Sequence, residues 1–325
     1  MPPSNWTVNN QGQTRNQPVY LINGPTASGK SSLAIRLAQR FNGVIINADS
    51  MQLYDAIPTL TAQPDEEELS QAPHRLYAVL KPSERTDAVQ WRDMATVEIR
   101  RAHDQGQTPI LVGGTGFYIQ TLTEGLSPIP DVPKAVRQRA DAHLTDIGLP
   151  AFYAELADQD PDIQNRIDPH NPRRVQRAWE VFHATGKSLI HWQSLPKSGP
   201  PAGLSFYKIA LAPAREDVYA RCNARFEQMF DTGAVEEAKM LKAGIDAGDV
   251  PTGALITKAI GFPETCQWLD GHIDKSTAIE RAQQATRRYA KRQMTWLRNQ
   301  FCAPMTLEHP NDDLPSELVN SFENR

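Results

Sequence analysis

Eight consecutive residues near the N-terminus have the types and spacing of a phosphate-binding loop, G-x-x-x-x-G-K-S. They are Gly24, Pro25, Thr26, Ala27, Ser28, Gly29, Lys30 and Ser31. Glycines let backbone N–H groups converge on phosphate oxygens, Lys30 adds a positive charge, and the Ser31 hydroxyl suits a Mg²⁺ ion. The run follows an apolar, β-prone segment and precedes one of helical periodicity, as such a loop requires. The pattern predicts a site for a di- or triphosphate and leaves its identity open.

A carboxylate, Asp49, follows the next apolar run, Val44–Ile46. In open α/β sheets, ligands bind in the crevice beyond the carboxyl ends of the strands, where Asp49 is expected. Asp49 could hold Mg²⁺ through water, or it could accept a proton from an incoming nucleophile. The residues from Asp49 to Tyr54 interleave hydrogen-bonding side chains with an aromatic. That mixture favours recognition of a nucleobase edge over bare metal binding.

A second glycine-rich turn, Gly113–Gly116, ends a third apolar run, Ile110–Val112. One interpretation is a tight connection from strand to helix. The other places Thr115 beside the phosphates or the acceptor of a transferred group. The residues alone leave both interpretations open.

Two clusters of basic residues stand out in a chain whose net charge is −4. The segment from Arg281 to Arg298 has six basic residues and no acidic one, and on a helix it would have one packed and one cationic side. A second cluster comprises Arg166, Arg173, Arg174 and Arg177. A solvated helix face normally mixes charge signs, so these clusters favour a polyanion bound at a defined place.

The sequence predicts an α/β fold for the elements that position these residues. Three runs are apolar throughout, at Val19–Ile22, Val44–Ile46 and Ile110–Val112. A fourth, Tyr207–Leu211, looks like another core strand although it contains Lys208, and helical patterns separate the four runs. Strands of this kind belong to a parallel sheet covered on both faces. Together with the phosphate loop they predict a P-loop NTPase-like parallel sheet core, and the proline-punctuated helical stretch between the last two runs predicts an inserted helical subdomain.

The predicted organisation has four parts. They are a disordered N-terminal tail (1–17), a catalytic core (18–125 and 202–303), an inserted helical tRNA-binding subdomain (126–201) and a polar C-terminal tail (304–325). The three cysteines, Cys222, Cys266 and Cys302, lack metal-ligand or disulfide spacing. No run of about 18 apolar residues exists, and residues 1–17 have no signal-peptide core. We therefore expect a cytoplasmic protein with no membrane contact.

The motifs in order resemble those of the bacterial tRNA dimethylallyltransferases, the isopentenyltransferases that modify an anticodon-loop adenosine. They are GPTASGKS (24–31), ADSMQLY (48–54), LVGGTGFYIQ (111–120), DPHNPRRVQRAWEVFHATGKS (168–188), RCNARFEQMFDTG (221–233) and ATRRYAKRQMTWLRN (285–299). The resemblance covers the chain from Pro18 to about Phe301. Six motifs in order are far more specific than the phosphate loop alone.

The resemblance implies an activity and its residues. Dimethylallyl diphosphate would lie in the phosphate loop with Mg²⁺, and the N6 amine of adenosine 37 would attack its allylic carbon. Asp49 would accept the amine proton, while Thr115 and Arg225 would steady the departing diphosphate. The expected contacts with the tRNA anticodon stem-loop are Asp49, Ser50, Met51, Gln52, Arg137, Arg173, Arg174, Val175, Gln176, Arg177, Lys258, Arg288 and Lys291. The enzyme is expected to be a monomer.

Two short segments depart from the family pattern. Lys258–Pro263 reads KAIGFP where a Gly-Tyr pair flanked by basic residues is usual, and Thr61–Pro64 reads TAQP in place of TAKP. Each change removes a hydrogen-bond donor or a charge from an expected tRNA contact.

Other functions fit parts of the pattern. A small-molecule or nucleotide kinase would use the phosphate loop and Asp49, but it has no use for two arginine clusters. A nucleotide-switched RNA-binding protein would use the clusters and leave Asp49 idle. A free-nucleotide isopentenyltransferase would need neither the insert nor the basic helix.

Overall fold

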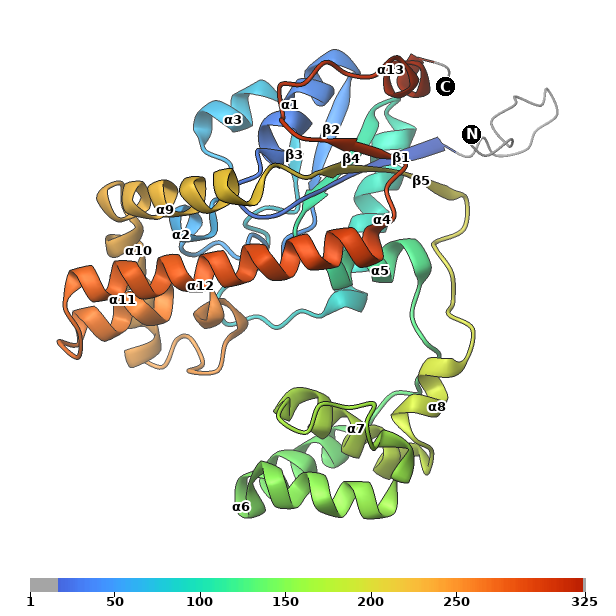
Figure 1. The fold of residues 1–325 in the computed structure, drawn as a ribbon, viewed down its shortest axis with the longest axis vertical. Coiled ribbons are helices and arrows are strands. Elements are labelled where there is room, and N and C mark those ends of the chain that lie inside the picture. Colours follow the sequence, from blue (N-terminus) through green and yellow to red (C-terminus); the bar gives the residue numbers. More distant parts are fainter. Residues whose placement is uncertain (1–16, 324–325) are drawn as a thin grey trace. The chain divides into compact units, whose positions relative to one another are not determined.

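The computed structural model describes residues 17–323 and contains an open sheet of parallel strands (Figure 1). The strand order is β3-β2-β4-β1-β5-β6. The strands are β1 (Gln17–Asn23), β2 (Gly43–Asn47), β3 (His74–Arg75), β4 (Thr108–Gly113), β5 (Leu204–Leu211) and β6 (Met305–Leu307). The parallel α/β core predicted from the apolar runs is confirmed, because every run identified in the sequence lies within a strand.

The chain divides into two compact units, and the larger one contains the sheet. The larger unit comprises residues 1–122 and 201–325, and the smaller one is Thr123–Pro200. The helical segments that follow the strands are α1 (Lys30–Arg40), α2 (Pro58–Thr61), α3 (Glu66–Gln71), α4 (Ala88–Asp104), α5 (Gly116–Glu124), α9 (Arg215–Asp231), α10 (Ala234–Asp246), η2 (Leu255–Lys258), α11 (Phe262–Leu269), α12 (Lys275–Trp296), η3 (Leu297–Phe301) and α13 (Ser316–Glu323).

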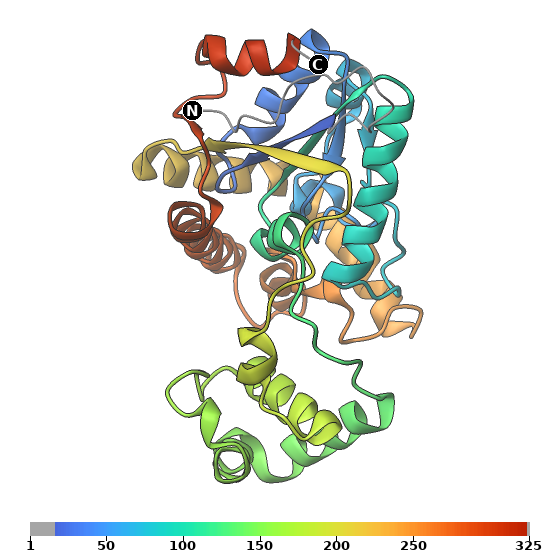
Figure 2. The ribbon, with the colours of Figure 1, turned by 90° about the vertical axis from the view of Figure 1, so that its right-hand side faces the viewer.

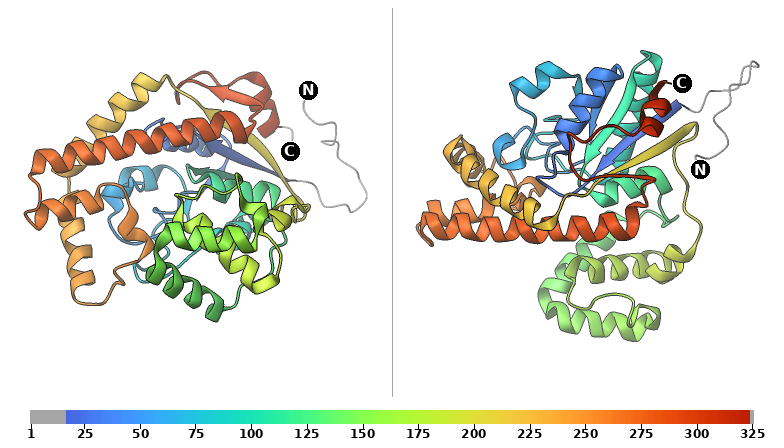
Figure 3. Two further views of the ribbon diagram at one scale, coloured as in Figure 1. Left: turned by 60° about the horizontal axis from the view of Figure 1, so that its bottom comes forward. Right: turned by 45° about the horizontal axis from the view of Figure 1, so that its top comes forward.

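Alternate residues of each strand supply two separate hydrophobic layers. Tyr20 and Ile22 pack with α1 and α13 on one face of the sheet, whereas Val19 and Leu21 pack with α4 and α5 on the other (Figure 2). α9 and α12 lie side by side along the second layer (Figure 3). Strands buried on both faces leave only their ends for polar chemistry.

The carboxyl ends of β1, β2 and β4 meet at one edge of the sheet. Asn23 at the end of β1 donates its side-chain amide to the carbonyl of Gly113 at the end of β4, at 3.0 Å. Asp87 caps α4 by accepting from the backbone N–H groups of the first turn. Trp91 in that helix donates its indole N–H to the carbonyl of Asn47, at 2.9 Å. These bonds fix the edge at which Asp49 follows β2.

The smaller unit is helical and has its own hydrophobic core. Its elements are α6 (Lys134–Gln159), η1 (Pro161–Ile163), α7 (Pro172–Thr185) and α8 (Leu189–Ser194). Phe152 and Trp179 stack at 5.7 Å between ring centroids and lie in this core with Val175. Gly148, with φ 74°, breaks α6 into two parts just before Pro150. The helical character expected of the insert, 126–201, agrees with these elements.

The prediction of a polar tail from residue 304 onward is wrong for the residues that the structure describes. β6 pairs with β5, and α13 packs on the sheet. Phe322 stacks on Tyr20 at 3.6 Å and on Phe41 at 4.1 Å between ring centroids. The apolar residues responsible are few and flanked by Pro and Asp, so the strand and helix depend on partners distant in sequence. Of the predicted N-terminal tail, residues 1–16 lie outside the described part, and Gln17 begins β1.

No helix within residues 17–323 is long and apolar enough to cross a membrane.

Candidate active site

The phosphate loop connects β1 to α1 in a conformation that depends on Gly29. Gly29 has φ 93°, a left-handed value that L side chains rarely adopt. The N–H of Ser28 donates to the carbonyl of Pro25 at 3.2 Å, and the Lys30 ammonium donates to the same carbonyl at 2.7 Å. α1 begins at Lys30. The loop therefore presents backbone donors and a cation at a helix N-terminus, an arrangement suited to phosphate.

Burial makes this loop dependent on an anion. The pKa of Lys30 is lowered to about 8, mainly by burial and also by the nearby Arg225, while the charge of Asp49 partly opposes the decrease. The Ser28 hydroxyl is fully buried and has no hydrogen-bond partner among the described residues. A bound diphosphate would favour the charged form of Lys30 and offer acceptors to groups that line this loop.

Asp49 follows β2 and lies near Lys30. Its own N–H donates to the Asn47 side chain at 2.7 Å, and its carboxylate accepts the N–H of Met51 at 3.0 Å. Burial raises the pKa of Asp49 above that of an ordinary aspartate, although the N–H of Met51 and the charge of Lys30 pull the pKa down. A buried carboxylate with a raised pKa is suited to accept a proton.

The turn Gly113–Gly116 lies directly against the strand end that carries Asp49. The N–H of Ser50 donates to the Thr115 hydroxyl at 3.1 Å, and the N–H of Thr115 donates to the carbonyl of Ala48 at 3.3 Å. α5 begins at Gly116. The turn connects a strand to a helix, as the first interpretation expects, and it also brings Thr115 into the cavity that Asp49 lines. The role of Thr115 beside a substrate stays a prediction.

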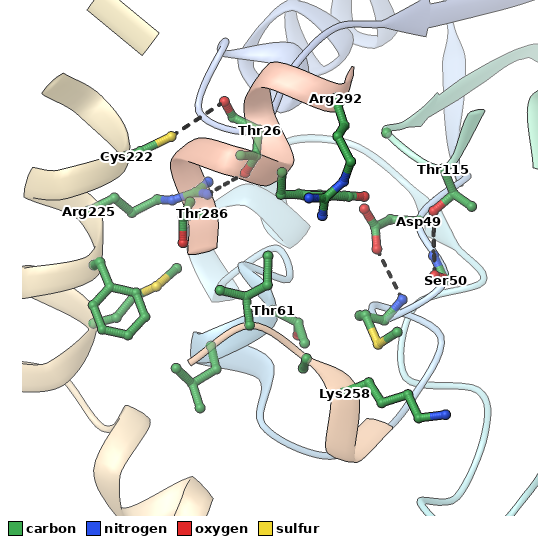
Figure 4. Close-up of a pocket in the computed structure, with 18 of the residues that line it drawn as sticks. Thr26, Asp49, Ser50, Thr61, Thr115, Cys222, Arg225, Lys258, Thr286 and Arg292 are labelled. Carbon is green, nitrogen blue, oxygen red and sulfur yellow. Dashed lines mark hydrogen bonds between the residues drawn. The ribbon is translucent and has the colours of Figure 1, made fainter. Parts of the chain in front are cut away.

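Arg225 reaches the phosphate loop from α9. Its guanidinium donates to the Thr26 hydroxyl at 2.5 Å, and burial lowers the pKa of Arg225. Figure 4 shows Arg225 entering the cavity from α9 and Arg292 entering from α12. The structure thus brings together Asp49, Thr115 and Arg225, the three residues expected to be catalytic.

Two cavities meet at Asp49. The cavity that we call the phosphate-side cavity has a volume of about 520 Å³ and is lined by Thr26–Ser31, Asp49 and Arg225. The reaction pocket, of about 450 Å³, shares Thr26, Asp49 and Arg225 and adds the apolar side chains of Met51, Leu60, Phe226, Met229 and Ile260. A polyphosphate and a flat, partly apolar second substrate can therefore approach the same carboxylate from two sides.

Gln293 is a site residue that the sequence did not reveal. It is buried on α12, where its side-chain oxygen accepts the N–H of Thr26 at 2.7 Å and its amide donates to the carbonyl of Gly114 at 3.1 Å. Tyr289, one turn earlier, lines the reaction pocket, and burial raises its pKa. The sequence predicted that this side of the helix packs, but helical periodicity cannot show that a packed glutamine bridges two loops.

The expected tRNA contacts of the larger unit lie in or beside the two cavities. Ser50, Met51 and Lys258 line the reaction pocket, and Figure 4 shows the Lys258 side chain pointing away from Arg225. Gln52 lines the phosphate-side cavity, but its amide already donates to the carbonyls of Thr61 and Ala62. Gln63 belongs to the segment Thr61–Pro64, which departs from the family pattern. Its side-chain amide likewise donates to a backbone carbonyl, that of Tyr54, at 2.9 Å. Arg288 and Lys291 are exposed on α12.

Of the tRNA contacts expected in the smaller unit, the prediction for Val175 is wrong, because its side chain is not at the surface. It is completely buried in that unit's core, because it faces inward on α7. Arg137, Arg173 and Arg174 are exposed. Gln176 donates to Asp141 at 2.6 Å, and Arg177 pairs with Glu180 at 3.3 Å. Their roles in tRNA binding stay predictions.

Among the described residues, the Ser31 hydroxyl is the protein ligand expected for Mg²⁺. Within residues 17–323, no group of three or more His, Cys, Asp or Glu side chains could hold a metal ion. Mg²⁺ is commonly bound by one or two protein ligands together with substrate phosphates and water. The Ser31 hydroxyl lines the phosphate-side cavity and fits that arrangement.

A phosphate loop on a parallel sheet, joined to a buried carboxylate and an apolar second pocket, defines a P-loop enzyme that brings a polyphosphate to a second substrate. Residues 52–300 match the family model described as IPP transferase. A tRNA dimethylallyltransferase of Rhodospirillum centenum is 48% identical over 307 residues, which cover 94% of this chain and 96% of that protein. The chain belongs to the IPP transferase family.

Solved structures agree with this assignment. A tRNA isopentenylpyrophosphate transferase of Bacillus halodurans is 32% identical, with a TM-score of 0.65 and 95% of each chain covered. A eukaryotic dimethylallyltransferase solved acting on tRNA is 31% identical, with a TM-score of 0.75 and coverage of 86% of this chain and 70% of that one. The fold class and the family expected from the motifs are confirmed.

Proposed function

We propose that this protein transfers a dimethylallyl group from dimethylallyl diphosphate to the exocyclic N6 amine of adenosine 37 in the anticodon loop of tRNA, releasing diphosphate. Relatives across almost the whole chain are tRNA dimethylallyltransferases. The observation that carries the proposal is the position of Asp49, at the junction of the phosphate-side cavity and the reaction pocket. The reaction requires one base that reaches both substrates.

The donor's diphosphate fits the phosphate loop. Lys30, the backbone N–H groups of the loop and the Arg225 guanidinium surround the phosphate-side cavity with positive charge. These groups favour the charge that develops on the leaving diphosphate, and a fixed, buried donor is more effective for this than water. Mg²⁺ held by Ser31 and the phosphates would neutralise further charge on the leaving group.

The acceptor adenine fits the reaction pocket. Met51 and Phe226 offer apolar surface to a base, and Asp49 lines the same pocket. The amine nitrogen forms a bond to the allylic carbon, the bond from that carbon to the diphosphate oxygen breaks, and Asp49 takes the amine proton. Extruding the adenosine costs a few kcal/mol, which is least for a base that is already single-stranded.

The kinase alternative has no support from the relatives, which are prenyltransferases. The pocket also disfavours a kinase, because the apolar side chains of Met51, Leu60, Phe226 and Met229 suit a flat base better than a small polar acceptor. An RNA-binding switch catalyses no group transfer, so the buried carboxylate of Asp49 would have no role as a proton acceptor.

One experiment separates these functions. The purified protein is incubated with labelled dimethylallyl diphosphate and Mg²⁺, with bulk tRNA in one reaction and AMP in another. Label that moves into RNA supports the proposal. Mapping the label to adenosine 37 supports the assignment of the acceptor nucleotide. Label that moves only into AMP would identify a free-nucleotide enzyme, and no transfer with either acceptor would refute prenyl transfer.

A further inference from the structure

One side of the reaction pocket is apolar and is formed by α9 and α2. Its side chains are those of Cys222, Phe226 and Met229 on α9 and of Leu60 on α2. The α9 residues are four and three positions apart, so they share one face of that helix. Figure 4 shows Cys222 across the pocket from Asp49 and Thr115. The pocket therefore has an apolar side opposite the side that carries the base.

The allylic carbon of the donor must lie where the two cavities meet. The residues that line both cavities are Thr26, Asp49, Thr61, Gly114 and Arg225. With the diphosphate in the phosphate loop, the bond that breaks lies at this junction, and the amine attacks from the opposite side of the carbon. The remaining carbons project sideways from the line of attack. Because hydrocarbon is stabilised against apolar surface, these carbons fit the side formed by Leu60 and Phe226.

Leu60 and Phe226 close the apolar side, and we call this pair the end wall. Both side chains are buried, with 7% and 4% of their surface exposed. Gly261 touches both but does not line the pocket, so it lies behind them. A Cβ atom placed on Gly261 would lie 2.7 Å from the Phe226 ring and 2.9 Å from the end of the Leu60 side chain. The backbone of Gly261 therefore prevents the end wall from moving back.

The backbone of α2 holds Leu60 in one position. The Glu237 carboxylate of α10 accepts the N–H of Thr59 at 3.0 Å and that of Leu60 at 3.4 Å. The residues that flank α2, Ile57 and Ala62, have φ values of 44° and 53°. Left-handed conformations of non-glycine residues persist only where the surrounding structure holds them. A close-packed and anchored wall cannot adjust to a longer ligand without strain.

We propose that the end wall selects the prenyl donor by its length. Leu60 and Phe226 end the pocket after five carbons, so they exclude geranyl diphosphate, which is one isoprene unit longer. This proposal rests on the proposed function and names the residues that set its donor specificity. The two sides of the pocket then have separate roles, because one side accepts the proton and the other limits the hydrocarbon.

The test is a competition between two donors in one reaction with the full-length protein, Mg²⁺ and bulk tRNA. Dimethylallyl and geranyl diphosphate carry different labels, and the ratio of the labels that enter tRNA gives the ratio of their kcat/KM values. Both donors meet the same active molecules, so a misfolded fraction does not change the ratio. The wild type should prefer dimethylallyl diphosphate by at least about a hundredfold, because a single methylene already changes kcat/KM by about 10 to 200-fold.

Shortening either side chain of the end wall should reduce this preference. Phe226→Ala and Leu60→Ala should each lower it at least tenfold, because five further carbons then find room. Phe226→Leu should lower it by a smaller factor, and this variant decides the question if Phe226→Ala does not fold.

Two variants serve as controls for the end wall. Phe230→Leu is matched to Phe226→Leu, because Phe230 is buried on α9 at 5.2 Å from the Phe226 ring but does not line the pocket. Met51→Ala enlarges the same pocket beside Asp49 instead of at the end wall. Both variants should keep the wild-type preference between the two donors.

Three results would overturn the proposal. They are equal use of both donors by the wild type, an unchanged preference in the end-wall variants, and an equal change in either control. Failure of the proposed function differs from these, because neither label would then enter tRNA. Isothermal titration of each diphosphate in the presence of tRNA would still test the end wall in that case. Phe226→Ala should bind geranyl diphosphate at least tenfold more tightly than the wild type does, and an unchanged affinity would refute the role of the end wall.

Discussion

The phosphate loop and the turn Gly113–Gly116 serve the same two cavities but are held in place differently. The phosphate loop gets much of its shape from its own residues, through Gly29 and the carbonyl of Pro25. The turn is held from outside, by Ala48, by the N–H of Ser50 and by Gln293. The difference shows that the conformation of the phosphate loop depends largely on local sequence, whereas the position of the turn depends on residues outside it.

Besides the bonds from Gln293 and Arg225 to Thr26, the phosphate loop lies close to the C-terminal segment. A Cβ atom placed on Gly29 would lie 2.7 Å from the Pro310 ring, in the segment after β6. The guanidinium of Arg36 in α1 donates to the carbonyl of Asp312 at 2.7 Å. Substitutions can therefore separate residues that perform chemistry from residues that align it, and the effects should decrease in that order.

The largest effect is expected for Asp49→Asn. A general base contributes about 10² to 10⁴-fold to rate, so single-turnover transfer should fall by at least two orders of magnitude while donor and tRNA affinities change little. If Asp49 mainly held Mg²⁺, its removal would instead weaken donor binding and raise the metal requirement. Titrating Mg²⁺ in the variant distinguishes the two, and recovery of transfer at high metal concentration would contradict the role as base.

Lys30→Ala tests the charge of the phosphate loop. Removing the ammonium that pairs with the phosphates should raise the KM for dimethylallyl diphosphate by about a hundredfold, because a hydrogen bond to a charged group contributes about 1.5 to 3 kcal/mol. The dissociation constant for tRNA should stay close to that of the wild type, since Lys30 lines only the phosphate-side cavity. An equal decrease of both affinities would contradict this division of tasks.

The pH dependence of donor binding follows from the same residue. The pKa of Lys30 in the free protein is lowered to about 8, so Lys30 is cationic below that pH and neutral above it. The affinity for dimethylallyl diphosphate should therefore decrease by about tenfold per pH unit above pH 8. Isothermal titration between pH 7 and 9.5 measures this, and a flat profile would refute the lowered pKa.

The transfer rate should also decrease as the pH is lowered, because Asp49 must be ionised to accept a proton. The pKa of Asp49 is raised, so this decrease should begin at a higher pH than for an ordinary aspartate.

The parts of this site that could be predicted from sequence are those with short-range rules. Gly24–Ser31 has a fixed spacing, Asp49 comes shortly after an apolar run, and parallel strands place both at one edge. Gln293 lies 267 residues from Thr26, and its role depends on a helix packing angle that no local pattern records. The C-terminal strand and helix were mistaken for a tail for the same reason, since Leu307 and Phe322 gain their partners only in the folded chain.

A smaller effect is expected for Gln293→Leu, which tests alignment without touching charge. Leucine would leave the N–H of Thr26 and the carbonyl of Gly114 without their partner, at a cost of about 1 to 3 kcal/mol for each buried group. We expect kcat/KM for the donor to fall roughly tenfold, with kcat contributing to the decrease. Gln283→Leu is the matched control, because Gln283 lies on the same helix and contacts Asn223 and Glu227 instead of the loops. Equal kinetics of the two variants would reduce Gln293 to a packing residue.

The smallest effect is expected for Pro310→Gly, which removes one external support of the phosphate loop. The Pro310 ring lies beside Gly29 and forms no hydrogen bond, because proline has no side-chain donor or acceptor. We therefore expect the KM for dimethylallyl diphosphate to rise about two- to fivefold at unchanged kcat, which corresponds to a cost below about 1 kcal/mol. Pro304→Ala is the control, since Pro304 is an exposed proline that lies before β6 instead of after it. The double variant Gly29→Ala/Pro310→Gly sharpens the test. Gly29→Ala alone suffers both the collision with Pro310 and the strain of φ 93°, so removing the ring should recover part of the donor affinity and leave the strain. No recovery would mean that the C-terminal segment packs beside the loop without shaping it.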